Sequence, residues 1–372
     1  MINIKYIIFA IAFLSCLSFI VTKDPSIQKK LILSKFMEGS PKDLFKVWHL
    51  IYNKDYNYNT HEGVQKYKTF KNNLSKIKEH NAKGEEEYTM GLHHLSDLTY
   101  EEFSQYYKLK PMKPKQLKRF LASKFINFDD YEDEETTQVV KQDNTADLTD
   151  VLFDPIDWNE QGKMQKVRDQ GQCGSCWAFT VMATIEGQIT ISGTTLNGWL
   201  STQQLVDCDS SNNGCDGGWF DGAMEYFRNV GPNYESDYAY EANQSTCRND
   251  SSKALSYRVN PLTSFKTASK AAVLITLLKL GPVSVAVDAN DKFMNYSGSV
   301  FSGACSADVN HAVTLVGYGQ TTNKKGKTIG YWIIRNSWSE EWGIKGHILI
   351  LQKAKNNGSC NVEKYGYQPV ML

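Results

Sequence analysis

The cysteines of this 372-residue chain are confined to its C-terminal part, with one exception near the start. The exception is Cys16. The other seven all follow residue 170 and are Cys173, Cys176, Cys208, Cys215, Cys247, Cys305 and Cys360. Because seven is odd, three disulfides and one free thiol are the simplest partition. Disulfides form in an oxidising compartment, and a free thiol there calls for an explanation.

The N-terminus predicts entry into such a compartment. Lys5 precedes an uncharged apolar run, Tyr6–Val21, which ends at Lys23 and Asp24. A basic start followed by about 7–15 apolar residues is typical of a secretory signal peptide, so we predict a signal over residues 1–22. Its removal would take Cys16 away. An uncleaved membrane anchor is the alternative for the same run.

The expected destination is a lysosome or acidic vacuole, or the extracellular medium. Sequons for N-glycosylation fit this route as a group, and they begin at Asn73, Asn243, Asn249, Asn295 and Asn357. After signal removal, no membrane association is expected.

The charge balance argues against two classes of partner. Lys+Arg and Asp+Glu both number 41, so the formal net charge is zero. Nucleic acid or an anionic membrane surface would favour an excess of basic residues. Hydrophobic residues make up 41% of the chain, which is enough to fill a core and excludes a largely disordered protein.

Residues 40–108 contain no cysteine and predict helices. After Ser40–Pro41, apolar residues recur at helical spacing from Leu44 to Tyr52. A second helix is predicted from six residues at steps of 4, 4, 3, 4 and 4, which lie on one face: Glu62, Lys66, Phe70, Asn73, Ile77 and Asn81. The spacing alone indicates only an amphipathic helix.

A charged segment over residues 109–151 separates this region from the rest of the chain. It has a basic patch between Lys113 and Arg119 and an acidic one between Asp129 and Glu135. Such blocks are usually solvated, so we predict an exposed linker that proteases can cut.

Residues 152–372 predict an α+β domain with two subdomains and a cleft between them. The first part, about 152–262, predicts helices at Trp177–Ile191 and Leu200–Val206. The second part, about 263–372, predicts one helix at Ser269–Leu280 and several strands. The predicted strands are Val283–Asp288, His311–Tyr318, Tyr331–Ile334 and His347–Leu351.

The stretch Gln170–Phe179, QGQCGSCWAF, carries the clearest chemical signal. A glycine-containing loop delivers Cys176 to the first turn of a predicted helix, where the helix dipole is expected to lower the pKa of the thiol. A thioredoxin-like redox pair with Cys173 is one alternative, but such a motif needs no distant His or Asn. A zinc site is another, but the chain lacks a second close pair of ligands, and no metal or other cofactor is expected.

A cysteine nucleophile needs a proton donor for the leaving amine. After the linker the chain has two histidines, and His311, which opens a predicted strand 135 residues after Cys176, is the candidate. Asn336, in RNSW, is the candidate for orienting the imidazole, and Trp338 would shield that hydrogen bond from water. His347 lies inside another predicted strand and is expected to be structural.

With these motifs, CDGG at 215–218 and VNHAV at 309–313, the chain resembles the papain-like cysteine peptidases, most closely the cathepsin L-like branch. The resemblance implies a papain-like fold and a cysteine endopeptidase made as a zymogen. It implies that Cys176 is the nucleophile, His311 its acid–base partner and Asn336 the orienting residue, and that Gln170 helps to bind the oxyanion. It also implies the disulfides Cys173–Cys215, Cys208–Cys247 and Cys305–Cys360.

The resemblance further implies a cleft that holds the substrate by backbone pairing and by an apolar pocket. Its residues would be Gly217, Gly218, Trp219, Phe220, Asn310, Ala312, Trp338 and Tyr365. Tyr365 replaces a small residue that is common in this branch, so a shallower pocket is expected. No inserted loop that would cap the cleft is evident, which favours an endopeptidase.

Residues 40–108 resemble the inhibitory prodomain of this branch. Lys66 stands where an arginine is usual, and in Gly91–Asp97 His93 and Leu95 replace an asparagine and a phenylalanine, whereas Asp97 is kept. The resemblance implies that the prodomain runs backwards through the cleft until the linker is cut near Leu152.

The implied partners are protein and peptide substrates, the chain's own prodomain and cystatin-like inhibitors, and the mature enzyme is expected to be a monomer. Two alternatives belong to other classes of protein. A catalytically silent homologue would act as a binding protein, but such relatives usually lose the residues that this chain keeps. A glutamine amidotransferase is usually cytosolic, which disagrees with the signal peptide and the cysteine count.

Overall fold

A computed structural model describes residues 24–106, 109, 118, 154–260, 265–352 and 358–372. The predicted signal peptide and nearly all of the predicted linker therefore lie outside the described residues. The chain divides into two compact units. The first runs to Gly84 and includes Met90–Thr99, and the second comprises Glu85–Thr89 and Tyr100–Leu372.

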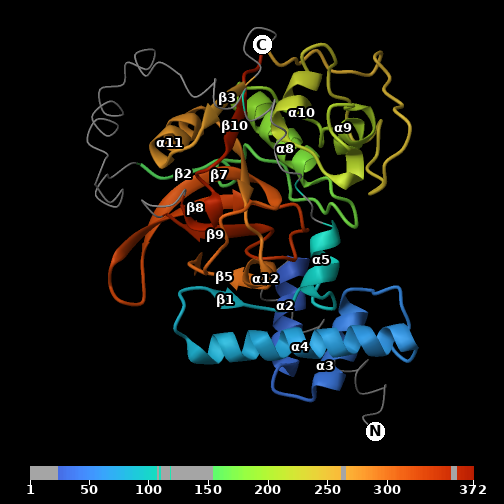
Figure 1. Ribbon diagram of the computed structural model, residues 1–372, viewed down its shortest axis with the longest axis vertical. Coiled ribbons are helices and arrows are strands. Elements are labelled where there is room, and N and C mark those ends of the chain that lie inside the picture. The colour runs from blue at the N-terminus through green and yellow to red at the C-terminus, as the bar shows by residue number, and fades with distance from the viewer. Residues whose placement is uncertain (1–23, 107–108, 110–117, 119–153, 261–264, 353–357) are drawn as a thin grey trace. The chain divides into compact units, whose positions relative to one another are not determined.

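The first unit contains three helices, α2 (Pro25–Phe36), α3 (Pro41–Ile51) and α4 (His61–Lys83) (Figure 1). The side chains of Asp24, Ser40 and Thr60 accept hydrogen bonds at the three N-termini, as N-cap residues do. The predicted helices α3 and α4 are confirmed. Helix α2 was not predicted because its apolar residues form no single stripe: Leu33 is buried, whereas Ile27 and Leu31 are exposed.

Aromatic rings and one amide hold α3 and α4 to the rest of this unit. The ring of Phe70 lies 5.1 Å from those of Phe45 and Trp48. Asn73 is buried, and its Nδ2 donates to the carbonyl oxygens of Ser96 (3.0 Å) and Leu98 (2.9 Å). The sequon at Asn73 is therefore closed to glycosylation in this fold.

The other predicted prodomain residues have different surroundings. Phe70 and Ile77 are buried on the same face as Asn73, whereas Glu62 is exposed in the first turn of α4. Asn81 pairs with both backbone groups of Met90, at 2.8 and 3.0 Å. The Asp97 carboxylate accepts a hydrogen bond from Tyr56 at 2.9 Å and lies 3.2 Å from Lys54 Nζ.

The helices of the second unit are mostly short. They are α5 (Tyr100–Tyr106), α8 (Cys176–Ile191), α9 (Thr202–Cys208), α10 (Phe220–Tyr226), α11 (Ala271–Leu280) and α12 (Asp291–Met294), with 3-10 turns at Gly214–Asp216 and Ser359–Asn361. Helix α8 is buried along nearly its whole length, from Cys176 to Ile189. The predicted helices near 177–191, 200–206 and 269–280 are confirmed as α8, α9 and α11.

A curled sheet of the order β3-β10-β4-β7-β8-β9-β6, with β2 paired to β7, forms the rest of this unit. The strands are β2 (Ile156–Asp157), β3 (Phe265–Ala268), β4 (Val283–Val287), β6 (Val300–Phe301), β7 (His311–Thr322), β8 (Thr328–Arg335), β9 (His347–Leu351) and β10 (Gly366–Pro369). Two shorter ones are β1 (Thr89–Met90), at the boundary of the two units, and β5 (Tyr296–Gly298).

The four predicted strands are confirmed as β4, β7, β8 and β9. Strands β2, β3 and β10 were not predicted because each has only two to four residues and shows no readable alternation. The pairing of β2 with β7 also shows that the start of the predicted helical subdomain contributes to the sheet.

The register of the sheet brings the start of one strand beside the end of its neighbour. Strands β7 and β8 are antiparallel, and Thr314 lies opposite Arg335. The first residue of β7 is His311, and the residue that follows β8 is Asn336. His311 and Asn336, which are 25 positions apart in the sequence, are thereby placed at the same end of these two strands.

Candidate active site

Cys176 is the first residue of α8, and the preceding loop is tightly fixed. A disulfide joins Cys173 to Cys215, and the Gly174 N–H donates to the Cys215 carbonyl at 2.8 Å. A Cβ at position 174 would lie only 2.4 Å from that carbonyl oxygen, so the loop needs glycine there. The indole N–H of Trp177 donates to Gly214 at 3.1 Å on the other side.

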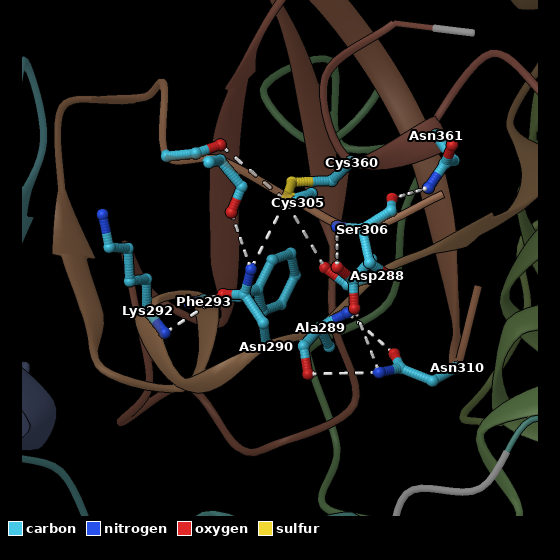
Figure 2. The surroundings of a disulfide bond; sticks show 12 residues. Asp288, Ala289, Asn290, Lys292, Phe293, Cys305, Ser306, Asn310, Cys360 and Asn361 are labelled. Carbon is cyan, nitrogen blue, oxygen red and sulfur yellow. Dashed lines mark hydrogen bonds between the residues drawn. A yellow bond between two sulfur atoms is a disulfide. The ribbon is translucent and has the colours of Figure 1, made fainter. Parts of the chain in front are cut away.

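The structure has the three disulfides that the resemblance implies. They join Cys173 to Cys215, Cys208 to Cys247 and Cys305 to Cys360, and the free thiol among the described cysteines is Cys176. Figure 2 shows the third of them beside Asp288 and Asn290. An odd thiol in a disulfide-bonded domain is thus located at a helix N-terminus.

His311 and Asn336 form a buried hydrogen-bonded pair. His311 Nε2 lies 2.8 Å from Asn336 Oδ1, and this oxygen also accepts the Ser337 N–H at 2.8 Å. Because the amide oxygen can only accept, the imidazole carries its proton on Nε2, which leaves Nδ1 as the basic nitrogen of the neutral ring.

Trp338 covers this pair. Its ring stacks on the imidazole of His311 with centroids 4.6 Å apart, and it is fully buried. The ring of Phe103, from α5, also contacts the indole edge-on, with centroids 4.7 Å apart. Aromatic rings on this hydrogen bond exclude water from it, as the sequence predicts for Trp338.

Cys176 lies beside the first residues of strand β7. The backbone N–H groups of Ala312, Trp177 and Cys176 itself interact with its thiol. Ala312 follows His311 directly, and Cys176 and His311 are both fully buried, so the thiol lies beside the start of the strand that carries the imidazole. The start of α8, the start of β7 and the residue after β8 thus place Cys176, His311 and Asn336 in one region of the second unit.

The prediction of a lowered pKa for the Cys176 thiol is wrong for the full-length chain, in which the thiol is buried. Burial raises the pKa of Cys176 to about 12, and the neighbouring backbone N–H groups lower it only in part. Burial also lowers the pKa of the His311 imidazole to about 4. Desolvation disfavours both charged forms, so the pair is neutral here.

Leu109, from the predicted activation segment, is part of the hydrophobic cluster in which Cys176 is buried. Its side chain packs into the hydrophobic cluster that contains Cys176, and its N–H donates to the carbonyl oxygen of Asn310 at 2.8 Å. Leu109 belongs to the second unit, and it precedes Cys176 by 67 residues. Nothing in the local sequence of the Cys176 loop could have revealed this neighbour.

Several predicted pocket residues lie in that same cluster. Trp219, Phe220 and Ala312 are all buried in it, and Tyr365 packs against it at 5.5 Å from the ring of Trp219. The apolar side chain of Leu109 thus belongs to the same hydrophobic cluster as the residues predicted to bind an apolar substrate residue.

The predicted backbone-binding residues are held rigidly. A Cβ on Gly218 would lie 2.6 Å from the Trp177 ring, which requires glycine at that position. The next residue back, Gly217, accepts the N–H of Asn213 at 3.0 Å. The Asn310 side chain accepts the Ala289 N–H at 2.7 Å and donates to Asp288 at 3.2 Å, as Figure 2 shows.

Gln170 is fixed by contacts that sequence reasoning missed. Its Oε1 accepts the hydroxyl of Ser337 at 2.5 Å, and its Nε2 donates to the Cys173 carbonyl at 2.9 Å. The hydroxyl of Tyr240 donates to the Gln170 carbonyl at 2.7 Å and contacts Ser175 at 2.6 Å. Ser337 lies inside the RNSW motif, which is the signal that could have identified it.

A buried ionic network behind the site was also missed. Glu186, on α8, accepts the Leu200 N–H at 2.7 Å and lies 3.6 Å from the Arg168 guanidinium. Arg335, directly before Asn336, donates to the Lys166 carbonyl at 2.7 Å, and burial lowers its pKa to about 10 while Glu186 opposes this shift. These charges connect α8, which begins at Cys176, to β8, which ends at Arg335.

His347 lies elsewhere in the sheet, opposite Arg335 on β9, and its Nδ1 contacts the Lys345 carbonyl at 2.9 Å. This placement agrees with a structural role. The sequon at Asn295 is also closed, because that side chain is buried.

Two features are absent from the described residues. No group of three or more His, Cys, Asp and Glu residues in this part of the chain is arranged to hold a metal ion. In the same part, no helix is long and apolar enough to cross a membrane.

Comparison with known proteins gives two family matches. Residues 152–370 match the family described as papain family cysteine protease, and residues 45–103 match the cathepsin propeptide inhibitor domain. These matches cover most of the chain between them.

Individual relatives agree. The cysteine protease XCP2 of Arabidopsis thaliana is 34% identical over 338 residues, which are 88% of this chain and 85% of the relative. A cathepsin L-like proteinase of Fasciola hepatica is 33% identical over 348 residues, 91% of this chain and 97% of the relative. The solved structure of digestive procathepsin L 3 from Tenebrio molitor matches with a TM-score of 0.70 at 30% identity, covering 90% of this chain and all of that one.

Proposed function

The chain belongs to the papain family of cysteine proteases and is made as a proenzyme with an inhibitory propeptide, and from this we propose that it is an endopeptidase with Cys176 as its nucleophile. The observation that carries the proposal is a buried free thiol next to the backbone of Ala312, the residue directly after the His311 of a hydrogen-bonded His311–Asn336 pair. The steps below assign each residue its part.

His311 takes the thiol proton on Nδ1 and the Cys176 thiolate attacks the peptide carbonyl carbon. The imidazolium then returns this proton to the leaving amine, which departs and leaves a thioester. A water molecule, deprotonated by His311, hydrolyses the thioester and restores the thiol. Asn336 keeps the ring oriented through all of these steps, since its oxygen accepts the Nε2 proton in both charge states.

The oxyanion that forms at each attack would be bound by the side-chain amide of Gln170 and the backbone N–H of Cys176. The support is the fixed position of Gln170, whose oxygen is held by Ser337 so that its N–H groups face the Cys173–Cys176 loop. A donor that is already in place costs no reorganisation during the reaction, and each is typically worth about 10²–10³ in rate.

Substrate would bind as Leu109 does in the proform. A backbone N–H would donate to Asn310, and an apolar side chain would lie among Trp219, Phe220 and Ala312. The other predicted cleft residues, Gly217, Gly218, Trp338 and Tyr365, would complete the walls, with Tyr365 making the pocket shallow. Leu109 is internal to the chain, so a residue with a peptide bond on each side can take this position, which favours internal cleavage.

Activation would require release of the segment that carries Leu109. We place the prodomain at residues 40–108, the activation segment at 109–151 and the mature enzyme at 152–372, with its new N-terminus between about Asp150 and Asp154. Transit through the secretory pathway to an acidic compartment or the medium completes the proposal, and cystatin-like proteins would be inhibitors of the open cleft.

Replacement of Cys176 tests the function. The Cys176→Ala enzyme should fold and retain three disulfides, but should hydrolyse no peptide amide. The activated wild-type enzyme and a Ser306→Ala variant, altered near a disulfide away from the thiol, are the controls. Residual hydrolysis of internal peptide bonds by Cys176→Ala, at the wild-type rate, would disprove the assignment.

A further inference from the structure

A second part of the pro-segment is bound by the second unit, at a distance along the chain from Leu109. The Glu85–Thr89 segment, of sequence EEEYT, belongs to this unit and contacts a surface formed by Lys292, Ser297, Phe301, Ser302 and Lys324. We refer to these five residues as the Lys324 surface. It belongs to β5, β6, α12 and the β7–β8 hairpin.

The acidic residues of the segment contact polar and basic groups. The Glu86 carboxylate accepts the Ser302 hydroxyl at 3.0 Å and lies 3.9 Å from Lys292 Nζ. The Glu87 carboxylate accepts the Lys324 backbone N–H with both oxygens at 3.2 Å, and the Lys324 ammonium donates to the Glu86 carbonyl. Two carboxylates are therefore recognised by ammonium, hydroxyl and backbone donors together.

The residues that follow are recognised by shape. Tyr88 is buried, and its ring lies 4.5 Å from that of Phe301. Phe301 in turn packs against Phe293 and Tyr296 at 5.9 and 6.2 Å. Thr89 completes the contact through its hydroxyl, 3.0 Å from that of Ser297. An acidic pair followed by an aromatic residue is the pattern that this surface fits.

The Lys324 surface is formed by bonds that do not involve the pro-segment. In the hairpin turn, Asn323 Oδ1 accepts the N–H groups of Lys325 (3.0 Å) and Lys327 (2.9 Å). Phe301 is held in the sheet opposite Ile350 of β9. These contacts lie within the mature region, so removal of residues 85–89 uncovers a surface that is already shaped.

We propose that in the processed enzyme the Lys324 surface is an exosite that recruits protein substrates carrying two or more carboxylates followed by an aromatic residue. This inference rests on the proposed peptidase function. The pro-segment itself indicates the length of chain that joins the two places, since Leu109 in the hydrophobic cluster of Cys176 follows Thr89 at this surface by 20 positions. A substrate tethered by such a length of chain can occupy both places at once, which raises its effective concentration at the cleft.

The experiment compares a short fluorogenic peptide with the same peptide joined to the sequence of residues 84–90, GEEEYTM, through a flexible linker of about 20 Gly/Ser residues, which spans roughly 25 Å on average. The tag is placed at either end in separate substrates. We expect the better tagged substrate to have a KM about tenfold lower than the untagged peptide, with kcat within twofold, and a gain that shrinks as salt is raised.

Charge reversal at the surface supplies the matched control. The double variant Lys292→Glu/Lys324→Glu should lose the tenfold gain but hydrolyse the untagged peptide normally, whereas Lys279→Glu, at an exposed lysine on α11, should keep the gain. Tags in which the three glutamates or the tyrosine are replaced by alanine should each lose most of it.

Two results would overturn the exosite. One is an equal KM for tagged and untagged peptides with the wild-type enzyme. The other is an unchanged gain with the tyrosine-to-alanine tag, which would mean general attraction of polyanions, acidic polysaccharides included. Failure of the proposed function would be distinct, because the untagged peptide would then not be hydrolysed at all.

Discussion

Leu109 donates its backbone N–H to Asn310, the residue directly before His311, while its side chain packs in the cluster that contains Cys176. One residue of the pro-segment thus engages a backbone acceptor and the apolar cluster of Cys176 at the same time. We propose that the proform blocks its own site in this way, as a bound substrate would, and that the contact helps to keep Cys176 and His311 away from water.

The first prediction concerns latency. Leu109→Ala should weaken the closed form by about 2 kcal/mol or more, the usual cost of truncating a buried leucine, and so raise the exposed fraction roughly 30-fold. The rate at which an alkylating reagent labels Cys176 in the full chain reports this fraction. Leu280→Ala, at an exposed leucine, should leave the rate unchanged. Equal labelling of Leu109→Ala and the wild-type chain would contradict the blocking role.

The second prediction concerns pH. Burial lowers the pKa of His311 from 6.5 to about 4, so its contribution to the closed form is fully present above pH 6.5 and is lost as the pH falls towards 4. The shift corresponds to about 3 kcal/mol. Cys176 behaves in the opposite way, because its raised pKa removes stability only in strongly alkaline solution.

We therefore expect labelling of Cys176 in the full chain, corrected for the reagent's own pH dependence, to accelerate between pH 6.5 and 4. His347 has a similar lowered pKa, caused by burial and then by Arg335, but it lies within the sheet and should affect global unfolding instead. His347→Gln should consequently keep the acceleration. A His311→Gln chain that still accelerated to the full extent would contradict the assignment.

The third prediction concerns the orientation of the proposed oxyanion donor. Ser337→Ala removes the hydroxyl that holds Gln170 Oε1, which frees the amide to rotate. We expect kcat to fall about tenfold with little change in KM, and Gln170→Ala to fall further, by about 10²-fold. Ser337→Thr keeps the hydroxyl and should restore part of the rate. A loss confined to KM would place Ser337 in substrate binding instead.

The fourth prediction concerns the buried charges. Glu186→Leu leaves the guanidinium groups of Arg168 and Arg335 without their buried carboxylate, and the free energy of unfolding should fall by about 3–5 kcal/mol. Glu186→Gln retains an acceptor for the Leu200 N–H and should cost less. Denaturant unfolding measures both, and Glu79→Ala at the exposed pair with Lys83 is the control, with no measurable change expected.

Much of this structure was readable from local pattern. Strands β7, β8 and β9 contain runs rich in apolar residues, and Ser40–Pro41 marks the start of α3. These elements were therefore predicted. Short strands such as β2 exist only because β7 offers a partner, which no local pattern records. Their prediction would have required the tertiary fold.

The same division holds for the site. Cys176, His311 and Asn336 occur in specific motifs, and the structure places them together. The state of the thiol could not be read in this way, because it depends on burial in a cluster that includes Leu109, a residue in a region of different composition. The helix N-terminus favours the thiolate, as expected, but burial outweighs it while the site is closed.

The burial of Cys176 also bears on how long the protein can be stored. Peroxide and other oxidants react with thiolates that solvent can reach, and sulfinic or sulfonic products are not reversed by ordinary reductants. A sulfur that is both covered and protonated survives passage through an oxidising compartment unchanged. Release of Leu109 therefore exposes the Cys176 thiol to substrates and to oxidants at the same time, so that proteolysis and oxidative inactivation become possible together.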